Sequence, residues 1–135
     1  MSSRMDDRIR SGLEKGIHEF NEEAFFEAHD TLEDVWMDAR GDVRLFLQGL
    51  IQLCIGYYHM SCDNFRGADH LLGRGIEKLE TYPAAAYGVD LKALLAEASK
   101  THDAVRQSRN GLSVAFWPIP KISTIDPVDS GSEAR

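Results

Sequence analysis

The segment from about residue 43 to 61 constrains the fold most, because apolar side chains surround almost the whole of the helix that it predicts. Its centre reads RLFLQGLIQLCIGYYHM, and a helix that is apolar on all sides has to be covered by other elements. Gly41 indicates the end of the preceding helix, and Asp42 predicts the N-cap of this one. We therefore expect this helix at the centre of a helical bundle.

The preceding helix is amphipathic and carries two polar residues on its apolar face. Asn21 predicts its N-cap, and Ala39 marks its expected end. At roughly 100° per residue, several residues share a face of about 120°: Phe25, Phe26, His29, Leu32, Glu33 and Trp36. His29 and Glu33 are spaced i, i+4, so their side chains can meet. We expect both to face the interior, where a carboxylate needs a cation, a donor or a proton.

A line of polar residues runs along the central helix. Gln48, Gln52 and His59 lie within about 40° of one another on the helical wheel, and Gly49 and Gly56 beside them let another backbone approach. A polar line on an otherwise apolar helix requires a polar partner. Since a short connection makes the two helices antiparallel neighbours, we expect their polar side chains to meet in a dry seam. The residues expected to converge there are His29, Glu33, Gln52 and His59.

Three further helices complete an all-α, single-domain bundle of about five helices in antiparallel hairpins. The first spans about residues 7–20, the fourth follows a cap at Asp63 or Asn64, and the fifth spans about residues 88–107. The fifth helix carries His102 on its apolar face, where we expect a hydrogen-bonded core or boundary histidine.

The chain loses its helical period after the fifth helix. The sequence FWPIPKI combines an aromatic pair with alternating prolines, which predicts an extended C-terminal segment. Its apolar residues Phe116, Trp117 and Ile119 are expected to dock on the bundle or on a second subunit. We expect a helical domain over residues 1–122 and a disordered tail over residues 123–135.

Composition excludes several kinds of partner and compartment. The net charge of −7 leaves no basic stripe that could release phosphate counterions, so we expect no nucleic-acid partner. No apolar run approaches the roughly 20 residues of a membrane span, and the first residues contain no signal-peptide run. We therefore expect a cytoplasmic protein without a membrane partner. Cys54 and Cys62 would lie about 12 Å apart on one helix, which predicts reduced thiols.

Four stretches of the chain resemble the motifs of domain of unknown function family 309 of bacteria and archaea. They read FNEEAFFEAHDTLEDVW, QGLIQL, YYH and NFRGADHLL. The matching positions are Phe25, Phe26, Glu27, His29, Glu33, Trp36, Gln48, Gly49, Gln52, His59, Asn64, Gly67 and Ala68. The resemblance covers about residues 17–80 and departs from the family pattern at Asp30, where many relatives carry Glu. It implies a compact all-helical fold and no settled activity.

Three interpretations stay open for the polar cluster formed by His29, Glu33, Gln48, Gln52, His59 and Asn64. The first is a hydrogen-bond network that fixes the register of two helices. The second is a divalent metal site with His29, Glu33 and His59 as ligands, since imidazoles and carboxylates bind zinc and iron. The third is a metal-free acid/base or small-molecule pocket, because a His–Glu pair in a low dielectric can be tuned toward neutral pKa.

A different class of function also stays open. The stretch NFRGADHLLGRGIEKL resembles small-residue helices that pack closely in helical interaction modules, and the aromatic C-terminal segment suits a shared interface. In this alternative the protein is an interaction scaffold or a homodimer, and the polar cluster is structural. The sequence names no substrate, ligand or catalytic residue, and it leaves open whether the protein is an enzyme.

Overall fold

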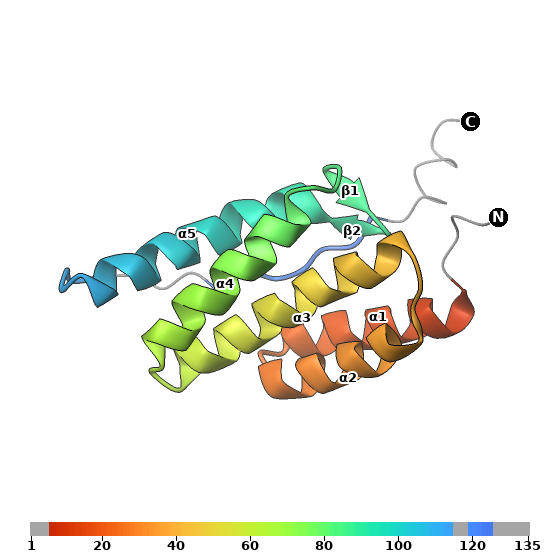
Figure 1. Cartoon of the computed structure of the whole chain (residues 1–135), viewed down its shortest axis with the longest axis horizontal. Helices are drawn as coiled ribbons and strands as arrows, with labels where there is room; N and C mark the ends of the chain where they lie inside the picture. Colours follow the sequence, from red (N-terminus) through yellow and green to blue (C-terminus); the bar gives the residue numbers. More distant parts are fainter. Residues whose placement is uncertain (1–5, 115–118, 126–135) are drawn as a thin grey trace.

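Helices account for most of the described chain, as the apolar periodicity predicts. The computed structural model describes residues 6–114 and 119–125. Its helices are α1 (Asp7–Asn21), α2 (Phe25–Asp38), α3 (Asp42–Ser61), α4 (Phe65–Leu79) and α5 (Leu91–Arg109). A short hairpin of β1 (Ala85–Ala86) and β2 (Val89–Asp90) lies between α4 and α5. For the described residues, the predicted all-α bundle of five helices is confirmed (Figure 1).

Helix α3 lies at the centre of the bundle, as its apolar sequence predicts. It packs against α2 on one side and α4 on the other, while α1 packs on α2 and α5 packs on α4 (Figure 1). Phe46, Leu47 and Leu53 on α3 are completely buried, and burying one such side chain stabilises the fold by about 1.5–3 kcal/mol. Three-residue connections join α1 to α2, α2 to α3 and α3 to α4, which makes these neighbours antiparallel.

Glycines let α3 and α4 approach closely. A Cβ at Gly49 would lie 2.7 Å from Cγ of Leu79, and a Cβ at Gly56 would lie 2.8 Å from Cδ2 of Leu72. A Cβ at Gly75 of α4 would lie 2.9 Å from the carbonyl oxygen of Gly49, so the two backbones are themselves close. The prediction that Gly49 and Gly56 admit another backbone is therefore confirmed.

One predicted N-cap is confirmed and two are wrong. The Oδ1 atom of Asn64 accepts a hydrogen bond from the Gly67 N–H at 3.0 Å, as expected of the cap of α4. Asn21 is instead the last residue of α1. Asp42 is the first residue of α3, and Gly41, with φ +73°, occupies the N-cap position before it.

The two displaced capping residues make long-range contacts instead. Asn21 donates from Nδ2 to the Ile122 carbonyl at 3.0 Å and accepts at Oδ1 from the Ile122 N–H at 2.7 Å. The Asp42 carboxylate accepts from the Tyr87 hydroxyl at 2.6 Å, and the Asp42 carbonyl accepts from Tyr82 at 2.7 Å. These bonds tie the C-terminal segment to α1 and the hairpin region to α3. Local patterns predict caps, but tertiary partners compete for the same side chains.

The β-hairpin replaces the first turn of the predicted fifth helix. Its strands pair in antiparallel register, and the turn residues Tyr87 and Gly88 have φ +51° and +79°. Positive φ at both central residues is the geometry that joins the strands of a two-residue hairpin. Helix α5 therefore begins at Leu91 instead of residue 88, and its N-cap is Asp90, whose side chain accepts from a backbone N–H at 3.1 Å.

The described part of the C-terminal segment is extended and lies against the bundle. Ile122 is 4% exposed and belongs to the core, and Ile119 packs against that core. The predicted docking of Ile119 is therefore confirmed. Phe116 and Trp117, which carry the rest of that prediction, lie outside the described residues.

The predicted tail is described only at its beginning. Residues 123–125 lie against the hairpin, where Thr124 forms an isolated antiparallel bridge with Val89 and the Ile125 N–H donates to the Gly88 carbonyl at 2.6 Å. Residues 126–135 lie outside the described residues. The boundary at residue 122 stays a prediction.

The predictions about thiols and membrane spans agree with the described structure. Cys54 and Cys62 are both free; the first is buried and the second is exposed. Burial raises the pKa of the Cys54 thiol, so this cysteine stays protonated and behaves as a small apolar side chain. Within residues 6–114 and 119–125, no helix combines the length and the apolar character needed to cross a membrane.

Candidate functional site

The buried face of α2 is centred on Ala28 and Leu32, both of which are at most 1% exposed. Phe25 and Val35 complete this face. The wheel drawn from the sequence centres the face about 80° away, toward Glu33. The difference matters because it moves the polar residues of α2 from the middle of the buried face to its edge.

The edge position gives His29 and Glu33 different environments. The His29 side chain is 17% exposed, whereas the Glu33 side chain is 49% exposed. The prediction that Glu33 is buried in a dry seam is therefore wrong. Phe26, which the wheel also places on the apolar face, is 50% exposed. Periodicity defines an apolar arc, but the packing of α1 and α3 decides which part of the arc is covered.

His29 lies between two carboxylates without a close hydrogen bond to either. Its Nδ1 atom is 3.6 Å from Oδ1 of Asp30, and its Nε2 atom is 3.6 Å from Oε1 of Glu33. Both distances exceed those of an N–H···O hydrogen bond. The Nδ1 atom is buried and has no hydrogen-bond partner, a state that costs about 1–3 kcal/mol.

His29, Asp30 and Glu33 have the composition of a metal-ligand set. One potential ligand atom from each residue lies within 4.8 Å of the other two, and among the described residues no other group of three His, Cys, Asp or Glu meets this condition. Asp30 is absent from the sequence-based site because the wheel places it on the solvated face. The spacing i, i+4 predicts the approach of Glu33 to the ring, whereas the position of Asp30, one residue after His29, is seen only in the folded chain.

The polar line on α3 turns toward the start of α4. His59 Nδ1 lies 3.2 Å from Nδ2 of Asn64, which donates because its Oδ1 is engaged by α4. Gln48 and Gln52 are half-buried, and Oε1 of Gln52 is buried without a partner. Within residues 6–114 and 119–125, no hydrogen bond or ion pair joins either glutamine or His59 to His29.

Ring contacts connect the two histidines across the surface of α2 and α3. Phe26 lies 5.7 Å from the His29 ring and 5.5 Å from the Tyr58 ring, and Tyr58 lies 6.2 Å from the ring of His59. Phe26 and Tyr58 are exposed, at 50% and 38%. The histidines thus flank one exposed aromatic pair, and His59 takes no part in the ligand group of His29.

A comparison with known protein families finds a match for the segment that contains these residues. A family model described as Domain of unknown function (DUF309) matches residues 13–71. This segment belongs to DUF309. The resemblance drawn from the four motifs is therefore confirmed. No curated protein matched the chain.

The DUF309 segment contains the whole His29 group but only part of a second histidine–carboxylate cluster. Asp69 on α4 lies inside the segment, whereas its partners His102 and Arg109 on α5 lie outside it. His102 Nε2 is 2.8 Å from Oδ1 of Asp69, and Arg109 donates to Oδ2 at 2.6 Å. The prediction of a hydrogen-bonded boundary histidine at residue 102 is confirmed.

The second cluster is electrostatically satisfied. Partial burial acts to raise the pKa of Asp69, but the hydrogen bonds and positive charges of His102 and Arg109 outweigh it and hold that pKa below its usual range. Both oxygens of this carboxylate already accept hydrogen bonds from partners on α5, so its charge is compensated within the protein. This cluster beyond the DUF309 segment therefore fastens α5 to α4, whereas the His29 group keeps its ligand atoms available.

Proposed function

We propose that the protein binds a divalent transition-metal ion, such as Zn²⁺ or Mn²⁺, through His29, Asp30 and Glu33 on α2. This proposal rests on the buried and unpartnered Nδ1 atom of His29, whose ring lies between the two exposed carboxylates. Asp30 takes the place that the sequence-based assignment gives to His59.

The separations of the candidate ligand atoms are close to those of a metal site. Zinc binds imidazole nitrogen and carboxylate oxygen at roughly 2.0–2.2 Å, so two ligands of a tetrahedral ion lie roughly 3.3–3.5 Å apart. The two distances of 3.6 Å around His29 approach this range. One imidazole nitrogen binds the ion together with the carboxylate beside it. The carboxylate beside the other nitrogen reaches the ion by rotation of its side chain. The exposure of Asp30 and Glu33, at 64% and 49%, gives them that freedom.

Three ligands from little more than one helical turn leave further coordination positions facing solvent. An ion held in this way exchanges water and can accept an additional small ligand, as catalytic metal sites do. Metal binding also requires a deprotonated imidazole nitrogen and ionised carboxylates, so the affinity should fall as the pH is lowered. The wet, open environment distinguishes this arrangement from a closed structural zinc site.

Isothermal titration calorimetry of the metal-free chain with Zn²⁺ and with Mn²⁺ tests the proposal. We expect one ion per chain, and we expect His29→Gln to weaken binding by about tenfold or more. His18→Gln is the matched control, because His18 is an exposed histidine on α1, and it should leave the affinity unchanged. Equal affinities of the two variants, or no binding by the unmodified chain, would contradict the proposal.

The exposed rings of Phe26 and Tyr58 favour a second candidate, self-association through α2 and α3. The two rings lie 5.5 Å apart and present apolar surface to solvent, which is typical of interaction surfaces. The partner in this candidate is a second copy of the chain. Sedimentation velocity should then show a concentration-dependent mass that Phe26→Ser lowers and that Leu112→Ser, at an exposed position after α5, leaves unchanged. A monomer at every concentration would exclude it.

A further inference from the structure

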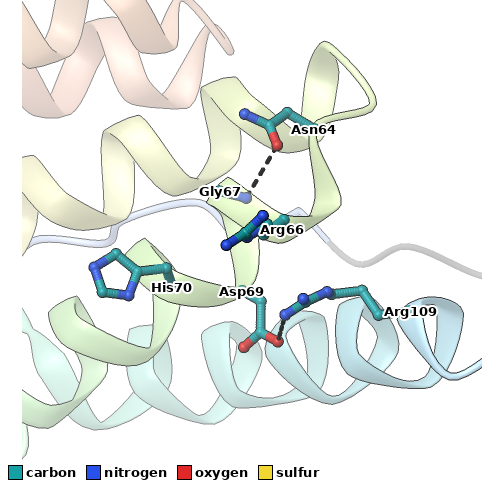
Figure 2. Close-up of a pocket in the computed structure, with 6 residues that line it drawn as sticks. All are labelled: Asn64, Arg66, Gly67, Asp69, His70 and Arg109. Carbon is teal, nitrogen blue, oxygen red and sulfur yellow. Dashed lines mark hydrogen bonds and ion pairs between the residues drawn. The ribbon is translucent and has the colours of Figure 1, made fainter.

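A pocket of about 600 Å³ opens at the start of α4, next to the end of α5. It is lined by Asn64, Arg66, Gly67, Asp69, His70 and Arg109 (Figure 2). The pocket is separate from the His29 group, because none of its lining residues comes from α2. Its volume is within the range of small-molecule sites in proteins, which is roughly 300–1,000 Å³.

The lining is basic in a chain whose net charge is −7. Arg66 and His70 are exposed and lie one turn apart on α4. Among the described residues, neither side chain has a hydrogen bond or an ion pair. The Arg66 guanidinium and the His70 imidazole, neither of which the protein uses for an internal contact, therefore face one concave surface.

Asp69 is the single carboxylate of the lining, and its charge is already compensated. His102 and Arg109 engage its two oxygens at 2.8 and 2.6 Å. The contact fixes the guanidinium of Arg109 at the pocket edge (Figure 2), which lowers the entropy cost of using its remaining N–H donors. Asp69 thus orients Arg109 and does not repel an anion as a free carboxylate would.

The beginning of α4 adds a further positive contribution. Asn64 and Gly67 line the pocket, and the side-chain cap between them marks the N-terminus of this fifteen-residue helix. The helix dipole places partial positive charge at this end. Side-chain cations and the dipole therefore act on the same space.

We propose that this pocket binds a small phosphorylated molecule, with the phosphate held by Arg66 and Arg109. Guanidinium groups match the planar pairs of oxygens on a phosphate and bind them bidentately. The pocket volume exceeds that of a phosphate group alone, so space remains for the organic part of a phosphomonoester. His70 lies beside this space and offers a further N–H donor.

Calorimetric titration of the full chain at low ionic strength, in the presence of a metal chelator, tests this proposal independently of the metal site. The probes are ribose 5-phosphate, inorganic phosphate and ribose. We expect ribose 5-phosphate to bind at one site and more tightly than phosphate, and ribose not to bind. Arg66→Gln should weaken the binding of ribose 5-phosphate by about tenfold, and added salt should weaken it further.

Arg74→Gln is the matched control, because Arg74 is exposed on the same helix but does not line the pocket. It should leave the affinity unchanged. Equal losses in Arg66→Gln and Arg74→Gln would indicate diffuse surface attraction and overturn the proposal. Absence of ribose 5-phosphate binding would also overturn it, and equal affinities for phosphate and ribose 5-phosphate would overturn the assignment to a phosphorylated organic molecule.

Discussion

His29 on α2 and His102 on α5 are equally buried, since 17% of each side chain is exposed, and each lies beside a carboxylate. They differ in how close the carboxylate lies to the imidazole ring and in how far that carboxylate is exposed to solvent. Asp69 is 22% exposed and lies 2.8 Å from His102, whereas Asp30 and Glu33 are largely exposed and lie 3.6 Å from His29. Burial therefore does not distinguish the two histidines. The hydrogen bonds that their ring nitrogens make, or fail to make, distinguish them.

The largest expected effect is on stability, at the satisfied cluster. Asp69→Asn keeps the side-chain size and removes the charge that His102 and Arg109 both engage. We expect a loss of about 1–2 kcal/mol in the free energy of unfolding, because charge-assisted hydrogen bonds are weakened and solvent screens part of them. Urea denaturation measures this loss. Asp30→Asn is the matched change at the other histidine, and a comparable loss there would remove the contrast between the two clusters.

The pH dependence of stability sharpens the same contrast. The folded pKa of Asp69 is lowered, so its contribution is fully present above the unfolded carboxyl pKa of about 3.9 and is lost as the pH falls through the lower folded value. The stability difference between the unmodified chain and Asp69→Asn should therefore shrink below about pH 4. Urea denaturation of both proteins between neutral and acidic pH measures it. A difference that stays constant throughout would show that the charge of Asp69 contributes nothing.

The smallest expected effect is at Glu33. Since its side chain is 49% exposed and 3.6 Å from His29, Glu33→Gln should change the free energy of unfolding by less than about 0.5 kcal/mol in the absence of metal. The same substitution should weaken the proposed binding of Zn²⁺, because an amide oxygen is a poorer ligand than a carboxylate. A loss of stability as large as that of Asp69→Asn would mean that Glu33 is buried after all.

Most of the fold follows from the sequence because its signals are local and repeated. The apolar side chains on nearly all sides of residues 43–61 predict the central helix, and Asn64 predicts the start of α4. The hairpin is missed because two-residue strands carry no alternation to recognise. Asn21 and Asp42 are misassigned because their tertiary partners, Ile122 and Tyr87, are far away in the sequence.

The candidate site is predictable only in part for a related reason. The spacing of His29 and Glu33 correctly places them beside each other, but periodicity does not reveal how far the covering helices extend. An error of about 80° on the wheel is enough to expose Glu33, and Asp30 is identified only by its distance from His29 in the folded chain. The orientation of His59 toward Asn64 depends on the packing of α4 on α3, which a single-helix wheel does not contain.

Titration of the isotopically labelled chain with Mn²⁺, followed by the loss of amide signals in two-dimensional NMR spectra, tests the account most directly. A bound paramagnetic ion broadens the signals of nearby residues, so the affected residues report where the ion sits. We predict that the signals of α2 residues around His29 and Asp30 broaden first, while those around Asp69 and His102 persist. Broadening that begins around Asp69, or that spreads evenly over the acidic surface, would contradict the assignment of the metal site to the histidine with the unpartnered nitrogen.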